Sequence, residues 1–184
     1  MQSARSRDLS WRRHAARATA AACAAAAAIA LALLGLPLVF GHYYYGLDQT
    51  QTNVGLLCAI ERLLAQDAPL WLSPAVGNGA PLLTRPEAAL FYPVRWLALL
   101  LPPDAGASLE AVLHLALAAA GATWLGRTFG LRPAAALAAG LATAFSGSYL
   151  DLLLHTSIYP AGGAWLPWVW AAARRALHPG GRAG

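Results

Sequence analysis

The sequence contains no lysine, and only 11 % of its 184 residues are charged. Ordinary soluble domains carry about 25 % charged residues, so this composition argues against a soluble domain of this size. Cysteine is also scarce, with Cys23 inside the first long apolar run and Cys58 outside it. Two cysteines placed in this way predict neither a disulfide nor a metal site. What is abundant is apolar: 58 % hydrophobic residues and a mean hydropathy of +0.49 indicate a membrane protein.

All 13 basic residues are arginines, and their positions decide more about function than their number does. Five precede the first apolar run, two lie in a short link between later runs, and three follow the last run. These are Arg5, Arg7, Arg12, Arg13 and Arg17; Arg127 and Arg132; and Arg174, Arg175 and Arg182. Every acidic residue except Asp8 falls in the other segments. This segregation matches the positive-inside rule, so membrane topology explains the basic charge and nucleic-acid binding is not expected.

The apolar runs predict an all-α, polytopic membrane protein with three to four transmembrane helices and a long extracytoplasmic first loop. The expected segments are a cytoplasmic basic leader at 1–17, transmembrane helices at 18–40, 108–126 and 134–150, a possible fourth at 160–173, a loop at 41–107 and a polar tail at 174–184. At about 1.5 Å per residue, the run 18–40 crosses about 30 Å of hydrocarbon. A secretory signal peptide is the alternative for this run. It is disfavoured because the apolar core is too long and no cleavage site follows Phe40.

The loop at 41–107 carries its own structural signals. Val54, Leu57, Ile60 and Leu64 recur at helical spacing and predict an amphipathic helix over 53–66, lying along the membrane surface or against the spans. Prolines and glycines then exclude a regular helix up to about Glu87. The apolar stretch 94–101 is too short to span and is expected to form an interfacial helix.

Two patterns within the predicted spans point to contacts between helices. Glu110 and His114 are four residues apart and therefore lie on one helical face. Ionisable residues at membrane depth usually face a cavity or another helix, although Glu110 at the headgroup level and a packed, hydrogen-bonded His114 is the simpler alternative. Ala136, Gly140 and Ala144 form a stripe of small residues that predicts close helix packing.

The order of several short motifs resembles a known family. They are Asp48 after the first span, Pro69-Leu70-Trp71, Gly79, Pro81-Leu82, Phe91-Tyr92-Pro93, Leu113-His114, Ser146-Gly147, His155 and Trp165-Leu166-Pro167. Together they resemble the amino-terminal part of the YfhO family, bacterial polytopic membrane proteins similar to the GT-C glycosyltransferases, which use polyprenyl-phosphate-linked sugars. The sequence departs from the family pattern at Glu87, where glutamine is typical, and at Leu72-Ser73, where the family has asparagine after the tryptophan.

The resemblance implies a sugar transfer on the extracytoplasmic face. Asp48 occupies the position of an acidic residue that acts as general base on the acceptor hydroxyl. Arg85 or Arg95 could stabilise the phosphate leaving group, although snorkelling to lipid headgroups is the favoured role for both. The substrate-binding candidates are Arg85, Glu87, Tyr92, His114 and His155. No metal site is expected, and the residues identify no cofactor.

The expected location is the bacterial inner membrane, with the amino terminus in the cytoplasm and membrane lipid and other membrane helices as partners. The YfhO family and its relatives have more spans than this sequence, so we expect a fragment or a subunit that docks with further helices. The alternative is a non-catalytic membrane component whose loop binds a partner or a lipid. In that case, large residues at Gly140 should disrupt assembly.

Overall fold

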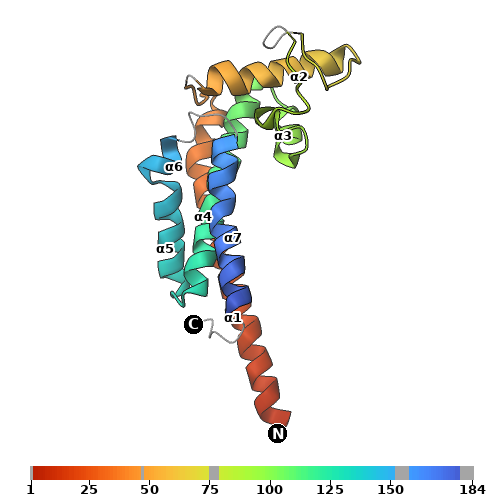
Figure 1. The fold of residues 1–184 in the computed structure, drawn as a ribbon. Coiled ribbons are helices and arrows are strands. Elements are labelled where there is room, and N and C mark those ends of the chain that lie inside the picture. The colour runs from red at the N-terminus through yellow and green to blue at the C-terminus, as the bar shows by residue number, and fades with distance from the viewer. Residues whose placement is uncertain (1, 47, 75–78, 152–157, 179–184) are drawn as a thin grey trace.

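The structure is a computed structural model that describes residues 2–46, 48–74, 79–151 and 158–178. These residues form helices and turns, with an isolated antiparallel β-bridge between Ser73 and Ala80. The all-α prediction is therefore confirmed. Four helices form an elongated bundle, and the segments between the first and second of them form a cap on one end of it (Figure 1).

The bundle consists of α1 (Gln2–Val39), α4 (Pro103–Thr128), α5 (Pro133–Ala144) and α7 (Ile158–Leu177). Two of these helices, α1 over Arg13–Val39 and α4 over its whole length, are long and apolar enough to cross a membrane. They correspond to the spans predicted at 18–40 and 108–126. Helix α4 is central, since 72 % of its most apolar window is buried, against 17 % for α1.

Alanine determines how closely the bundle helices approach one another. Buried Ala26 and Ala30 of α1 pack against Ala116 and Ala119 of α4. The predicted stripe of small residues on α5 is also buried, and a Cβ atom at Gly140 would overlap the α4 backbone. The prediction of close packing by this stripe is confirmed, and the helix that it approaches belongs to the same chain.

The helices predicted at 134–150 and 160–173 form with different limits. The first ends at Ala144, and a short helix α6 (Gly147–Asp151) follows it. At about 1.5 Å per residue, the 12 residues of α5 extend about 18 Å. Helix α7 is longer than expected, with 20 residues and Pro167 inside it. Membrane crossing by either segment stays a prediction.

The cap contains a π-helix η1 (Gln49–Val54), α2 (Gly55–Ala65), a 3-10 turn η2 (Pro86–Ala88) and α3 (Pro93–Ala98). The two predicted loop helices are thus present, although the buried face of α2 differs from the expected one. Leu64 is exposed, and the cap core is built from Leu56, Ile60, Leu63, Leu82, Ala88 and Leu90. Leu57 connects this cap to the bundle by packing on Ala98 of α3 and Ala107 of α4.

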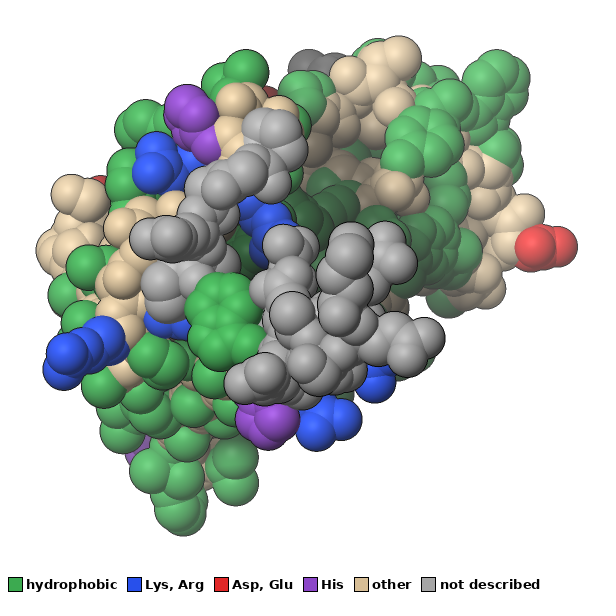
Figure 2. Space-filling model, turned by 90° about the horizontal axis from the view of Figure 1, so that it is seen from below, with side chains coloured by type: hydrophobic (Ala, Val, Ile, Leu, Met, Phe, Trp, Pro, Cys, Tyr) green, Lys and Arg blue, Asp and Glu red, His purple; other side chains and the backbone are tan. Residues whose placement is uncertain are grey.

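Among the described residues, the arginines outside the cap gather at the opposite end of the bundle. The start of α1, the link between α4 and α5, and the last turn of α7 all lie there (Figure 1). Arg127 of α4 donates to Thr19 of α1 over 3.1 Å, and Arg174 of α7 donates to the carbonyl of Thr128 over 3.1 Å. Figure 2 looks at this end and shows several arginine side chains on it. The fold therefore places the described arginines of the three basic groups on one end.

Candidate functional site

The centre of the cap is a buried arginine, Arg95, which the sequence predicted at the membrane surface or near a phosphate group. Pro93 begins α3, where a proline at the first helical position needs no hydrogen-bond partner. The helix then turns Arg95 inward, and its side chain has no exposed surface. The expectation that Arg95 snorkels to lipid headgroups is therefore wrong, because α3 presents this residue to η1 and α4.

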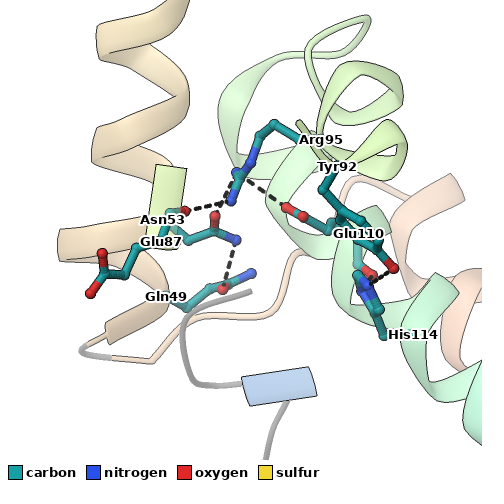
Figure 3. Close-up of polar contacts among 7 residues, drawn as sticks. All are labelled: Gln49, Asn53, Glu87, Tyr92, Arg95, Glu110 and His114. Atoms are coloured by element: carbon teal, nitrogen blue, oxygen red, sulfur yellow. Dashed lines mark hydrogen bonds and ion pairs between the residues drawn. The ribbon is translucent and has the colours of Figure 1, made fainter. Parts of the chain in front are cut away.

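The guanidinium of Arg95 connects three segments of the chain (Figure 3). Its Nη1 atom lies 3.1 Å from Oε2 of Glu110 on α4 and 2.7 Å from Oδ1 of Asn53 on η1. Its Nη2 atom donates to the backbone carbonyl of Glu87 over 3.1 Å. A planar guanidinium with several fixed donors suits this arrangement, which the single ammonium of a lysine could not match.

The charge on Arg95 is balanced inside the protein. Burial lowers the pKa of the Arg95 guanidinium from its ordinary value, and the carboxylate of Glu110 opposes this by favouring the charged form. An arginine keeps its proton under these conditions, so the site holds a desolvated ion pair. Removing one partner of such a pair typically costs about 3–5 kcal/mol, which makes the pair a strong constraint on how the cap sits.

A pair of amides extends the polar cluster along η1. The Nδ2 atom of Asn53 donates to Oε1 of Gln49 over 3.2 Å, and both side chains are buried. These residues are four apart and share a face of η1. The polar run QTQTN before an apolar helix was the available signal for them, but their partner Arg95 is 42 residues away from Asn53 in the sequence.

His114 forms a second branch of the cluster. Its Nδ1 atom lies 2.6 Å from the backbone carbonyl oxygen of Glu110, and its Nε2 atom lies 2.8 Å from the hydroxyl of Tyr92. The rings of His114 and Tyr92 also stack, with centroids 5.4 Å apart. The prediction that Glu110 and His114 share a helical face is confirmed. The imidazole is buried with both nitrogens hydrogen-bonded, which is the simpler of the two expected environments.

Tyr92 links this cluster to a groove on the surface of the cap. Its hydroxyl also accepts a hydrogen bond from Nε1 of Trp165 on α7, over 3.2 Å at an exposed position. The groove has a volume of about 480 Å³ and lies between the segment 83–92 and the first turns of α7. It is lined by Leu83, Thr84, Arg85, Pro86, Ala89, Leu90, Phe91, Tyr92 and Ala161.

The groove is apolar apart from a few groups. Arg85 supplies its positive charge and is half-buried, with Nε 3.7 Å from the carboxylate of Glu87. Both of these side chains retain about a third of their exposure, so the contact is solvent-screened and weak. Arg85 is therefore available to pair with an anion that enters the groove.

The predicted site residues divide into three groups in the structure. Arg85 and Tyr92 line the groove. His114 is buried and hydrogen-bonded to the hydroxyl of Tyr92. Glu87 lies beside Arg85, and its backbone carbonyl accepts a hydrogen bond from Arg95. Asp48 precedes η1, is half-buried, and is not among the groove-lining residues. The remaining candidate, His155, lies outside the described residues.

Comparison with known proteins gives no match: no protein-family description, curated protein or solved structure is significantly similar to this sequence.

Proposed function

We propose that this chain is a multi-pass inner-membrane module whose cap binds the anionic head of a membrane amphiphile, as the amino-terminal part of a GT-C-like glycosyltransferase of the YfhO type. The amphiphile in that reaction is a polyprenyl-phosphate-linked sugar. The observation that supports this proposal best is the groove itself. It combines an apolar lining with one arginine, on the cap at the end of a bundle that contains two apolar helices.

The orientation follows from charge. Arginines of α1, of the link between α4 and α5, and of α7 gather at the end of the bundle opposite the cap. Cytoplasmic loops of membrane proteins carry such an excess of basic residues. The cap, with its groove, then lies on the extracytoplasmic side, where lipid-linked sugars are used by the GT-C enzymes.

The chemistry proposed for this site is an inverting glycosyl transfer. The acceptor hydroxyl attacks the anomeric carbon of the donor while Asp48 removes its proton. The bond between the anomeric carbon and the phosphate oxygen breaks, and the phosphate leaves with the electron pair. Arg85 would balance the charge on that phosphate from the groove wall. Further helices of a longer protein or of a partner would have to bring the acceptor to Asp48.

The binding step is tested with Arg85→Gln in purified protein. Lipid-free protein in detergent is titrated with a polyprenyl phosphate, and the bound fraction is measured by native mass spectrometry. We expect about tenfold weaker binding, the effect of one lost charge-assisted hydrogen bond. Arg62→Gln is the matched control, because Arg62 is an exposed arginine of the same cap outside the groove. Equal affinities for both variants would contradict the assignment of the groove.

The catalytic step is tested with Asp48→Asn in membranes that contain the complete protein. Loss of a general base should lower sugar transfer by about 10²- to 10⁴-fold without lowering the amount of inserted protein. Asp67→Asn is the control, because Asp67 is exposed and has a left-handed backbone (φ 51°) that asparagine tolerates. Full transfer by Asp48→Asn would exclude this role.

A second candidate function is a non-catalytic lipid-binding subunit. The observation in its favour is that Asp48 is not among the groove-lining residues, while Arg85 is. This candidate predicts that Asp48→Asn has no effect and that Arg85→Gln still weakens lipid binding. It no longer predicts that Gly140 contacts a partner, because Gly140 packs against α4 of its own chain.

A further inference from the structure

Tyr92 lines the groove, and its hydroxyl contacts the buried polar cluster. It is 2.8 Å from Nε2 of His114 on the buried side and 3.2 Å from Nε1 of Trp165 on the exposed side. A tyrosine hydroxyl has one proton to donate and two lone pairs that accept. Whether this hydroxyl can donate a hydrogen bond to a ligand or accept one from it therefore depends on which of these two neighbours donates and which accepts.

The contacts of His114 fix the direction of its hydrogen bonds. Its Nδ1 atom faces a backbone carbonyl oxygen at 2.6 Å, and a carbonyl can only accept, so Nδ1 carries a proton. The imidazole is 1 % exposed, and the carboxylate of Glu110 already pairs with Arg95, so a second buried positive charge would have no counter-ion there. The ring is therefore neutral, and Nε2 is an acceptor.

The proton of the Tyr92 hydroxyl accordingly points inward to His114. The indole Nε1 of Trp165 can only donate, so it occupies one of the two lone pairs of the same oxygen. Among the described residues, no other group uses the second lone pair. Tyr92 can thus accept a hydrogen bond from a ligand in the groove, and it has no proton left to give to one.

We infer that the groove selects anionic amphiphiles whose head group carries a hydroxyl, with Tyr92 accepting from that hydroxyl and Arg85 pairing with the anionic group. This inference rests on the proposed binding function of the groove and adds its specificity. An ammonium donor fits less well, because Arg85 in the same groove repels a second positive charge. Tyr92 and Arg85 together therefore distinguish lipid head groups of equal charge by whether the head group carries a hydroxyl.

The experiment compares phosphatidylglycerol with phosphatidylmethanol of the same acyl chains. Both lipids carry one negative charge, and only the first has hydroxyls. Native mass spectrometry of the purified protein, titrated with each lipid, gives the two affinities. We expect phosphatidylglycerol to bind about 2- to 10-fold more tightly, the effect of one added hydrogen bond. Excess soluble glycerol phosphate should not displace either lipid, and displacement would contradict an amphiphilic ligand.

Variants assign the preference to the hydroxyl of Tyr92. Tyr92→Phe should reduce the ratio of the two affinities to about one. Trp165→Phe removes a donor and no acceptor, so the preference for phosphatidylglycerol should persist in that variant. This second variant decides the question if Tyr92→Phe fails to fold, and loss of the preference in Trp165→Phe would contradict the assignment to Tyr92.

The failures of the two proposals are distinguishable. Equal affinities of the unmodified protein for both lipids, each weakened by Arg85→Gln, would overturn the hydroxyl preference and leave the groove as an anion site. Affinities that Arg85→Gln does not change would overturn the proposed function together with the inference.

Discussion

Arg95 and Glu110 form an ion pair that joins the cap to the bundle. The two charged groups are 3.1 Å apart, and neither side chain has any exposed surface. The pair connects α3 to α4 across Pro102 and Pro103. It therefore fixes the position of the groove segment 83–92 relative to α4. Burying a pair of charges stabilises little by itself, but leaving one charge alone is costly.

Substituting one member of this pair should therefore destabilise the fold far more than substituting both. Arg95→Met and Glu110→Leu should each lower the midpoint of thermal unfolding in detergent by roughly 10 °C, corresponding to about 3–5 kcal/mol. The double variant Arg95→Met/Glu110→Leu should recover most of this loss. Intrinsic tryptophan fluorescence follows the transition, and Arg62→Met serves as the surface control. Additive losses in the double variant would show that the charges act independently.

Substitution by alanine should destabilise the protein at Gly140 and stabilise it at Gly55. A Cβ atom at Gly140 would overlap Oγ1 of Thr123 and the carbonyl oxygen of Ala119, so Gly140→Ala should destabilise the bundle by about 1–3 kcal/mol. Gly55 is an exposed helical glycine with open space around its Cα, and Gly55→Ala should stabilise α2 by about 0.5–1 kcal/mol. Thermal unfolding measures both changes, and equal effects would contradict the close contact between α5 and α4.

Replacing Ala89 with glycine should stabilise the cap. It follows η2 with a left-handed backbone (φ 49°), a conformation that costs L-residues about 1–2 kcal/mol. Part of that gain is offset by the greater chain entropy of glycine, so we expect Ala89→Gly to stabilise the cap by roughly 0.5 kcal/mol. The control Ala98→Gly, in the regular helix α3, should destabilise it. A loss of stability in Ala89→Gly would argue against this backbone conformation.

Cys58 reports the side of the membrane on which the cap lies. In a Cys23→Ala background, a membrane-impermeant maleimide added to intact spheroplasts should label Cys58 if the cap is extracytoplasmic. Burial and the nearby Glu61 carboxylate raise the pKa of the Cys58 thiol, so less thiolate is present at neutral pH and labelling should accelerate as the pH rises. Cys58→Ser gives the background. Labelling only after lysis would place the cap in the cytoplasm.

The periodic features of the fold were predictable because their causes are local. Long apolar runs gave α1 and α4, and the small residues of α5 indicated a face for close packing that the structure places against α4. The limits of α5 and α7 were less predictable. The span predicted at 134–150 is broken after Ala144, and α6 begins at Gly147 within the polar stretch Ser146-Gly147-Ser148.

For the site residues, the sequence identified candidates but not the distant groups that they contact. Tyr92 stands in a short motif, and Arg85 was proposed for its charge; both line one groove. Arg95 was expected at the lipid surface and is completely buried. An arginine in an apolar stretch has the same local sequence whether it meets lipid or a carboxylate. Asn53, 42 residues before Arg95, is one of the groups that decide between these environments.

The sequence by itself determined the helical class, the apolar helices and the segregation of charge, because each of these depends on composition and periodicity within one segment. Only the tertiary structure decided which polar groups meet. Trp165 donates to Tyr92 across 73 residues, and Tyr92 reaches His114 across 22. A hydrogen bond requires its donor and acceptor to lie within about 3 Å, and only the packing of the cap against α4 and α7 brings these groups that close.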